Sequence, residues 1–229
     1  MGRSVLVTGG TGGLGTAVTD AFLEAGWRVV VPWIVQDELE RMPARSGLEM
    51  VRADLFDVAA ARDVATVVTA DADAPLRAVV NLIGGFAMGG RVHETPVEEF
   101  ENQLRLNLRA TYLTCQQTIP HLRKAGGGSI VCMSSRAALH PFSGAAGYVT
   151  SKAAVLAFVS CLDAEYARDG IRANAVLPGV IDTPGNRAAM PDSDRKDWVS
   201  PADIARTIVF LAGDESSAIS GAQVPVHRA

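Results

Sequence analysis

A phenol and an ammonium group stand four residues apart in the stretch GYVTSKA, residues 147–153. The apolar periodicity of the stretch that follows predicts a helix, which would place Tyr148 and Lys152 on one face. A free phenol titrates near pH ~10, so proton transfer near neutrality requires about 4 kcal/mol of phenolate stabilisation. An ammonium group about 4 Å away supplies roughly that amount at an effective dielectric constant of about 20. The pair could transfer protons, although taken alone the commoner meaning is a Tyr and a Lys stacked on a helix surface.

A glycine-rich turn, TGGTGGLG at residues 8–15, leads into a second helical pattern. Glycines at such a junction let the backbone approach a pyrophosphate, which the helix amino terminus stabilises through free N–H groups and its dipole. A plain glycine-rich loop is the alternative, but the strand-to-helix context favours a dinucleotide site. The candidate cofactor-binding residues of this turn are Gly9, Thr11, Gly12, Gly13, Leu14 and Gly15.

Strands and helices must position these residues. Short β-branched runs alternate along the chain with longer amphipathic stretches. Strands are predicted at 4–8, 28–33, 48–52, 77–82, 129–135, 171–177 and, with a weaker pattern, 222–226. Helices are predicted at 13–26, 57–70, 96–124, 147–169 and 201–213. This alternation predicts an α/β fold: a single Rossmann-type doubly wound parallel sheet of about seven strands, with helices on both faces. Such sheets bind ligands beyond the carboxyl ends of their strands.

The composition is that of an ordinary globular chain. It has 229 residues, a net charge of −4, 48% hydrophobic and 20% charged residues, so we expect one domain over 1–229 and no nucleic-acid or membrane partner. A strand pattern begins within four residues of the amino terminus, which leaves no room for a leader and predicts a cytoplasmic protein. Cys115, Cys132 and Cys161 are expected to be buried free thiols. No metal site is expected, because His93, His121 and His227 lack ligand spacing.

The spacing of Gly9, Gly13 and Gly15 resembles the TGxxxGxG turn of the short-chain dehydrogenase/reductase family. Further positions match that family in order. Tyr148 and Lys152 match its YxxxK, Ser135 stands thirteen positions before the tyrosine, and Asn107 in LRLNLRATY matches the asparagine of its tetrad. By the same resemblance, the remaining cofactor contacts are Asp54 and Leu55 near the adenine, Asn81 and Gly84 in NLIGG, and Pro178, Gly179, Ile181 and Thr183 in PGVIDT, besides Tyr148 and Lys152 themselves.

The resemblance implies an NAD(P)-dependent oxidoreductase that transfers hydride between a nicotinamide cofactor and a carbonyl or alcohol substrate. Small ketones such as 3-oxoacyl compounds are the expected substrates. Tyr148 would be the acid in reduction and the base in oxidation, with its pKa lowered by Lys152, which also holds the nicotinamide ribose. Ser135 would donate a hydrogen bond to the substrate oxygen. Asn107 would hold a water next to Lys152 or bend its helix through backbone bonds, and the two roles are compatible.

Three positions depart from the family pattern. Trp33 stands where an Asp commonly binds the adenosine ribose, and Gly12 replaces the basic residue of the turn. Without a positioned cation a 2′-phosphate would be poorly compensated, which favours NAD(H) unless Arg41 or Arg52 folds in. Trp33 could stack on the adenine, wall off the phosphate site or simply pack in the core or an interface. In NLIGG, Leu82 replaces a second amide, so one polar contact near the cofactor is in doubt.

The segment at about 184–200 is polar and rich in proline, and by the resemblance it forms a short substrate lid. Phe86, Met88, His140 and Phe142 either line the substrate cleft or pack in the core. Family members commonly assemble as homotetramers or homodimers, and the apolar face of 147–169 fits that expectation.

Two other functions are consistent with the glycine-rich turn. One is a non-catalytic NAD(P)-sensing binding protein, against which the full set of Asn107, Ser135, Tyr148 and Lys152 argues. The other is a sugar-nucleotide epimerase or dehydratase, which needs a sizeable substrate domain, and too few residues follow Thr183 to form one.

Overall fold

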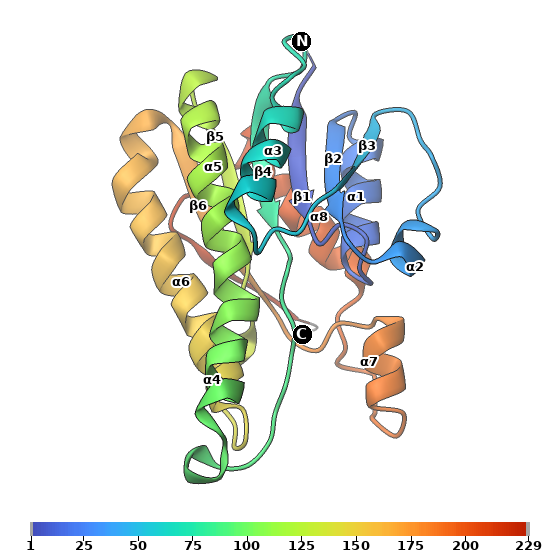
Figure 1. Cartoon of the computed structure of the whole chain (residues 1–229), viewed down its shortest axis with the longest axis vertical. Coiled ribbons are helices and arrows are strands. Elements are labelled where there is room, and N and C mark those ends of the chain that lie inside the picture. Colours follow the sequence, from blue (N-terminus) through green and yellow to red (C-terminus); the bar gives the residue numbers. More distant parts are fainter. Residues whose placement is uncertain (1, 228–229) are drawn as a thin grey trace.

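A single parallel sheet organises the computed structural model, which describes residues 2–227 (Figure 1). Its seven strands lie in the order β3-β2-β1-β4-β5-β6-β7. They are β1 Ser4–Thr8, β2 Arg28–Trp33, β3 Leu48–Arg52, β4 Leu76–Asn81, β5 Gly128–Met133, β6 Ile171–Pro178 and β7 Gln223–Val226. The doubly wound fold that the sequence predicts is therefore confirmed, including the weakly patterned last strand.

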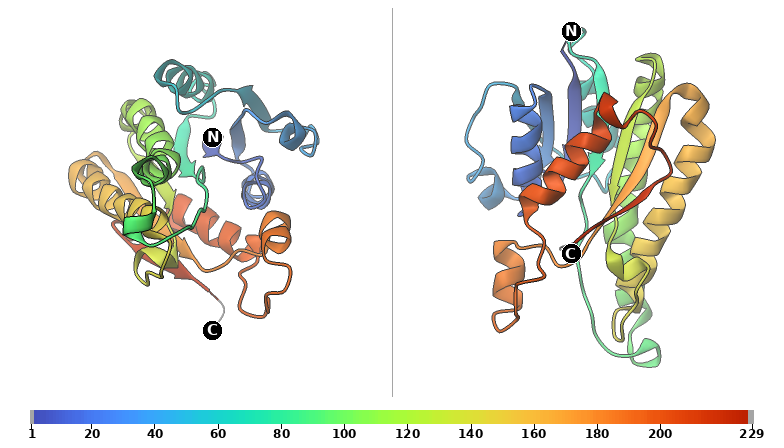
Figure 2. Two further views of the ribbon diagram at one scale, coloured as in Figure 1. Left: turned by 60° about the horizontal axis from the view of Figure 1, so that its bottom comes forward. Right: turned by 180° about the vertical axis from the view of Figure 1, so that it is seen from behind.

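Helices cover both faces of the sheet. They are α1 Gly15–Glu24, α2 Gln36–Leu39, α3 Val58–Val68, α4 Val97–Leu104, α5 Ala110–Lys124, α6 Ala146–Tyr166, α7 Pro184–Ala189 and α8 Pro201–Ala212. The pair α1 and α8 packs on one face, as the view from behind in Figure 2 shows. Phe22 and Ile208 are fully buried there. The other face is covered by α3, α5 and α6, around Leu122 and Val159.

Strand order reverses beside β1. Its neighbour on one side is β2 and on the other β4, and Thr8 pairs in register with Asn81 at the carboxyl ends of β1 and β4. Chains leaving these two ends diverge to opposite faces, which opens a crevice of the kind that binds ligands in doubly wound sheets. The glycine-rich turn follows β1, and the loop after β4 continues well beyond the sheet (Figure 1).

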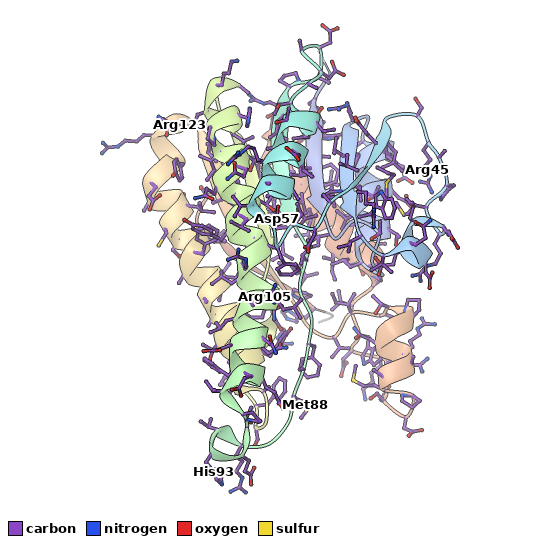
Figure 3. All side chains as sticks on the ribbon, viewed as in Figure 1. Arg45, Asp57, Met88, His93, Arg105 and Arg123 are labelled. Atoms are coloured by element: carbon purple, nitrogen blue, oxygen red, sulfur yellow. The ribbon has the colours of Figure 1, made fainter. Side chains whose placement is uncertain are left out.

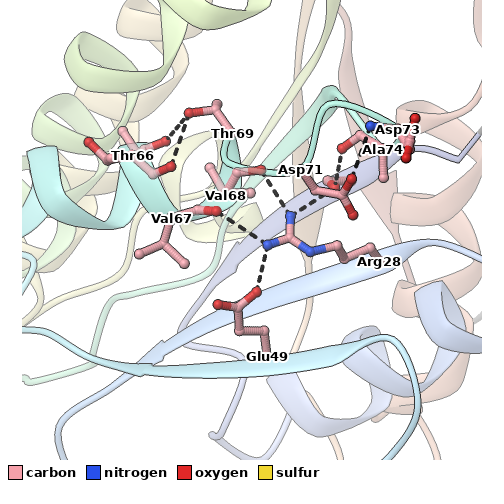
Figure 4. A network of polar contacts seen from close by, with 11 residues as sticks. Arg28, Glu49, Thr66, Val67, Val68, Thr69, Asp71, Asp73 and Ala74 are labelled. Atoms are coloured by element: carbon pink, nitrogen blue, oxygen red, sulfur yellow. Dashed lines mark hydrogen bonds and ion pairs between the residues drawn. The ribbon is translucent and has the colours of Figure 1, made fainter.

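The opposite edge of the sheet is closed by Arg28, at the start of β2 (Figure 4). Its guanidinium donates to the carbonyl oxygens of Val67 and Val68 at 3.2 and 3.0 Å, where α3 ends. It also donates to Ser4 Oγ at 3.1 Å and pairs with Glu49 at 2.5 Å. One side chain thus ties β1, β2, β3 and α3 together, far from the crevice.

The helix predicted at 96–124 is interrupted. Between α4 and α5, residues Arg105–Arg109 form a π-helix with Asn107 at its centre. The short helices α2 and α7 were not predicted, because four and six residues carry too few periodic positions.

Among the described residues, no helix is long and apolar enough to cross a membrane. Cys115 and Cys132 are buried free thiols as expected, but Cys161 is exposed, so that part of the prediction is wrong. Cys161 falls on the outer side of α6, whose uniformly apolar sequence does not reveal which face is buried.

Candidate active site

Ser135 and Tyr148 come to the crevice from β5 and α6. Ser135 lies two residues beyond β5 in extended conformation and caps the 3-10 turn Arg136–Ala138 by accepting the Ala137 N–H at 3.1 Å. Tyr148 lies in the first turn of α6 and is half-buried. The Ser135 hydroxyl interacts with the phenol of Tyr148, which brings together the two side chains predicted to contact a substrate oxygen.

Lys152 is buried, with only 4% of its surface exposed. Its Nζ donates to the carbonyl oxygen of Met133 at 3.2 Å and lies 6.0 Å from the centre of the Tyr148 ring. Burial lowers the pKa of Lys152 to about 8, and the nearby Cys132 thiol opposes this shift. The ammonium therefore lies on the predicted face of α6, directed at the end of β5.

Burial also has the largest effect on the pKa of Tyr148. It raises the pKa of the phenol above its ordinary value, and the Ser135 hydroxyl offsets only part of the rise. The expectation that Lys152 lowers this pKa is not met here, because the ammonium is directed at the Met133 carbonyl and burial of the phenol dominates the shift.

Asn107 is buried in the π-helix and makes backbone contacts on both sides. Its Nδ2 donates to the carbonyl oxygens of Gln103 and Gly85, each at 3.1 Å, while its Oδ1 accepts the Gly85 N–H at 3.0 Å. The first bond satisfies a helix carbonyl beside the bulge, and the other two fix the loop after β4. A π-bulge of this kind often marks a functional site.

Gly84 explains how Asn107 and Lys152 approach each other. A Cβ at position 84 would lie 2.5 Å from Asn107 Oδ1 and 3.0 Å from Lys152 Nζ, so only glycine fits between them. The loop after β4 thus passes directly over both side chains.

The glycine-rich turn is tightly folded. Gly9 adopts φ +68°, and its carbonyl oxygen accepts the Gly12 N–H at 3.2 Å. A Cβ on Gly15 would lie 1.9 Å from that same oxygen, so glycine is required there. No side chain caps the amino terminus of α1 at Leu14, which leaves N–H groups of the first turn available to an anion, apart from that of Thr16, which donates to the Gly12 carbonyl at 3.0 Å. This backbone fits the pyrophosphate of a dinucleotide.

The segment after β6 faces that turn. A Cβ on Gly13 would lie 3.1 Å from Thr183 Cβ, so the two predicted cofactor segments meet. Thr183 caps α7 by accepting the Asn186 N–H at 3.2 Å. Ile181 and Val199 form an isolated parallel bridge, which joins the two ends of the segment predicted as a lid. Pro178 ends β6, and Gly179 follows it.

Residues predicted near the adenine follow β2 and β3. Trp33 ends β2, half-buried and in register with Arg52. Asp54 Oδ1 accepts the Phe56 N–H at 2.9 Å, and Leu55 is buried. A carboxylate that the sequence reasoning missed also lies here: the Thr11 hydroxyl donates to Glu38 Oε2 at 2.5 Å. Its position depends on α2, so only the chance spacing of an acid some 20 residues past the turn could have pointed to it.

Asn81 lies in the core. Its Nδ2 donates to the sulfurs of Cys115 and Cys132 at 3.5 and 3.7 Å, and its buried Oδ1 has no hydrogen-bond partner. The side chain is therefore turned into the sheet and away from the crevice. Leu82, the departure from the family pattern, keeps β1 and β4 together through its backbone, whose N–H donates to the Thr8 carbonyl at 3.2 Å.

Aromatic side chains stand beside Tyr148. The Phe86 ring meets the Tyr148 ring edge-on at 5.0 Å, and Phe142 lies 6.3 Å from Phe86. Phe86, Phe142 and Met88 are all exposed, so they form a wall rather than a core. A cavity of about 440 Å³ adjoins them, lined by Tyr148, Met88, Val92, Val97 and Phe100 among others. Figure 3 shows Met88 and His93 on the loop beyond β4, while His140 is exposed on the loop before α6.

Among the residues that the structure describes, no group of three or more His, Cys, Asp or Glu side chains is placed to hold a metal ion.

Comparison with known proteins relates the chain to a large group of oxidoreductases. The family model described as enoyl-(acyl carrier protein) reductase matches residues 9–228. A 2-(R)-hydroxypropyl-CoM dehydrogenase from Xanthobacter autotrophicus is 33% identical, with 100% of this chain and 98% of that protein covered.

Solved structures agree with this. A short-chain type dehydrogenase/reductase from Mycobacterium ulcerans superposes with a TM-score of 0.89 at 25% identity, covering 98% of this chain and 88% of that one. ElxO with NADP bound superposes with a TM-score of 0.91 at 24% identity, covering 99% and 97%. The latter likeness is one of fold, and its NADP gives no support to the expected preference for NAD(H).

Proposed function

The chain belongs to the short-chain dehydrogenase/reductase family and is an NAD(P)-dependent enzyme acting on alcohol and carbonyl groups, and from this we propose that it reduces a small ketone with Tyr148 as the proton donor. The observation that carries the proposal is the convergence of three groups. Tyr148 and Ser135 interact at the crevice, and the buried Lys152 lies on the same face of α6. The preferred substrates are 3-oxoacyl compounds or similar small ketones.

In reduction, Tyr148 gives its phenolic proton to the substrate oxygen, and in oxidation the phenolate takes it back. Ser135 donates a hydrogen bond to the same oxygen and stabilises the charge that develops there. The bound nicotinamide supplies or accepts the hydride. The phenol of Tyr148, whose pKa burial raises above its ordinary value, is protonated at neutral pH, which is the form that reduction requires.

Lys152 and Asn107 support this proton transfer. Lys152 has a pKa of about 8 and can therefore exchange a proton near physiological pH. Asn107 holds the loop after β4 over Lys152 through its bonds to Gly85, and it would also hold a water through which a proton leaves. A binding protein that only senses a dinucleotide has no use for the interacting hydroxyl groups of Tyr148 and Ser135 at the position of a substrate oxygen.

The cofactor would lie across the carboxyl edge of the sheet. The turn from Gly9 to Gly15 would hold the pyrophosphate, with Asp54 and Leu55 at the adenine and Gly84 close to the nicotinamide ribose, while Trp33 borders the adenosine ribose. Pro178, Gly179, Ile181 and Thr183 would hold the nicotinamide end, since Thr183 meets Gly13. The structure gives Asn81 a core position, so any contact it makes would come from its backbone.

The substrate would enter between the aromatic wall and α7. Phe86 packs on Tyr148 and Phe142 lies next to Phe86, so this surface favours a ketone with an apolar substituent. Residues at about 184–200 would serve as its lid within one domain spanning 1–229, because the Ile181–Val199 bridge fixes the two ends of an otherwise exposed segment.

The proposed location is the cytoplasm, where the free thiols of Cys115 and Cys132 stay reduced. A homodimer or homotetramer is the proposed assembly.

The test is an assay of the purified protein with reduced nicotinamide cofactor and a panel of small ketones, including aryl, alkyl and 3-oxoacyl members. We expect oxidation of the cofactor that depends on the ketone, with the aryl and longer alkyl members preferred. Phe86→Ala should raise KM for those substrates more than for acetone, because it removes an exposed apolar ring that packs on Tyr148. Absence of ketone-dependent turnover with NADH and NADPH across the panel would contradict the proposal.

A further inference from the structure

We propose that Glu38, on α2, selects the cofactor by excluding the 2′-phosphate of NADP, so that the enzyme uses NAD(H). This inference rests on the proposed function, because it concerns the adenosine end of the same cofactor site. The end of β2 carries the uncharged Trp33, so it cannot distinguish the two cofactors by charge. Glu38 would make that distinction instead.

The carboxylate of Glu38 is fixed at the glycine-rich turn. Thr11, only 6% exposed within that turn, donates its hydroxyl to Glu38 Oε2 at 2.5 Å. Val35 stays extended and lets α2 begin at Gln36, three residues after β2 ends, and the Glu38 N–H bonds back to the Val35 carbonyl at 3.2 Å. The chain thus folds Glu38 back from β2 onto the turn that follows β1.

That position lies where a dinucleotide presents its adenosine ribose. In doubly wound sheets the ribose sits between the glycine-rich turn and the end of the second strand, and an acid some 20 residues past the turn reads its hydroxyls. A carboxylate has about four acceptor sites, of which the Thr11 hydroxyl uses one. Glu38 can therefore accept hydrogen bonds from a ribose diol, whereas a 2′-phosphate brought to the same place meets a like charge.

Two of the three cations on neighbouring segments already have partners elsewhere. Arg41 donates from Nε to the carbonyl oxygen of Asp37, back along α2. Arg45 pairs with Asp20 on α1 at 2.6 Å. Arg52 lies at the end of β3, beside Trp33 and one strand further from the turn than Glu38.

The experiment is a fluorescence titration of the wild-type protein, Glu38→Gln and the control Glu40→Gln with NADH and, separately, NADPH. Glu38→Gln removes the charge and keeps an acceptor for Thr11, while Glu40 is an exposed acid at the end of the same helix. We expect wild-type protein and Glu40→Gln to bind NADH about tenfold or more tightly than NADPH. In Glu38→Gln this ratio should fall by about tenfold, mainly through tighter binding of NADPH.

Two outcomes would overturn the inference while leaving the enzyme assignment intact: a wild-type preference for NADPH, or a ratio that Glu38→Gln leaves unchanged. Because the titration measures binding, it is independent of the choice of ketone. If neither dinucleotide binds the folded wild-type protein, the proposed function fails as well. A circular dichroism spectrum of each variant shows that it is folded.

Discussion

Lys152 shows most directly that a residue is placed for something other than stability. It is 4% exposed, and burial brings its pKa from 10.5 to about 8. That difference corresponds to roughly 3 kcal/mol at neutral pH, partly offset by the hydrogen bond to Met133. A buried ammonium that costs stability is a mark of a functional site.

Replacing Lys152 by Met should therefore stabilise the protein at pH 7 by about 1–2 kcal/mol while abolishing turnover. The wild-type cost is complete below pH 8 and disappears as pH rises from about 8 to 10.5, where folded Lys152 is neutral and unfolded Lys152 is still charged. Urea unfolding at pH 7 and in that alkaline range measures the gain, which should shrink with pH. Lys124→Met, at an exposed position near the end of α5, should show neither effect. A loss of stability in Lys152→Met that is independent of pH would contradict this explanation.

Spacing alone suggested Tyr148 and Lys152 as a pair, and the resemblance to the short-chain dehydrogenase/reductase family added Ser135, because order and spacing are local features of the chain. The electrostatics could not be predicted in the same way. The pKa of Tyr148 depends on how far α6 buries the phenol and where the ammonium points, and both follow from packing. The wrong prediction that Cys161 is buried also depended on packing, since α6 is apolar on nearly every side and its sequence does not show which side is buried.

The two ends of the parallel strands differ in what they carry. The carboxyl edge carries the candidate site, and the amino edge carries the contacts of Arg28, which satisfy two carbonyl groups at the end of α3 (Figure 4). Because these acceptors are partly buried, losing their donor should cost stability without changing the site.

Arg28→Ala should lower the free energy of unfolding by about 2–3 kcal/mol and leave KM for cofactor and ketone unchanged. Arg45→Ala is a matched control, since Arg45 makes an exposed ion pair with Asp20, worth about 0.5 kcal/mol or less. Chemical denaturation and steady-state kinetics of both variants measure the difference. Equal stability of the two variants, or a KM that changes only in Arg28→Ala, would contradict the assignment of Arg28 to stability alone.

Strands were predictable at this scale because alternating β-branched runs bounded by glycine and charged residues have few other structures open to them. The three strands β1, β2 and β3 begin and end at the predicted residues. The π-helix at Arg105–Arg109 was not predictable, since the apolar period continues through it, and its Asn107 contacts Gly85, a residue distant in the sequence. Glu38 escaped prediction because it meets Thr11 only through the unpredicted α2.

At the scale of the whole molecule, aromatic side chains on the outer sides of α5 and α6 suggest where copies of the chain meet in a dimer or tetramer. Tyr112 on α5 is 48% exposed and lies 5.7 Å, between ring centres, from Phe158 on α6. Side chains of this kind are enriched in the centres of interfaces. We expect light scattering at micromolar concentration to give the mass of a dimer or tetramer and Tyr112→Glu to reduce it. A monomer mass for the wild-type protein would contradict the proposed assembly.

The most direct test of the whole account is turnover by Tyr148→Phe, which keeps the ring packed against Phe86 and removes only the transferable proton. Tyr112→Phe makes the same change at a tyrosine on α5, outside the crevice. Both variants should bind cofactor as the wild-type protein does, and kcat for a confirmed ketone should fall at least about 100-fold in Tyr148→Phe alone. Near-wild-type turnover by Tyr148→Phe would show that another group delivers the proton and would contradict the assignment of Tyr148.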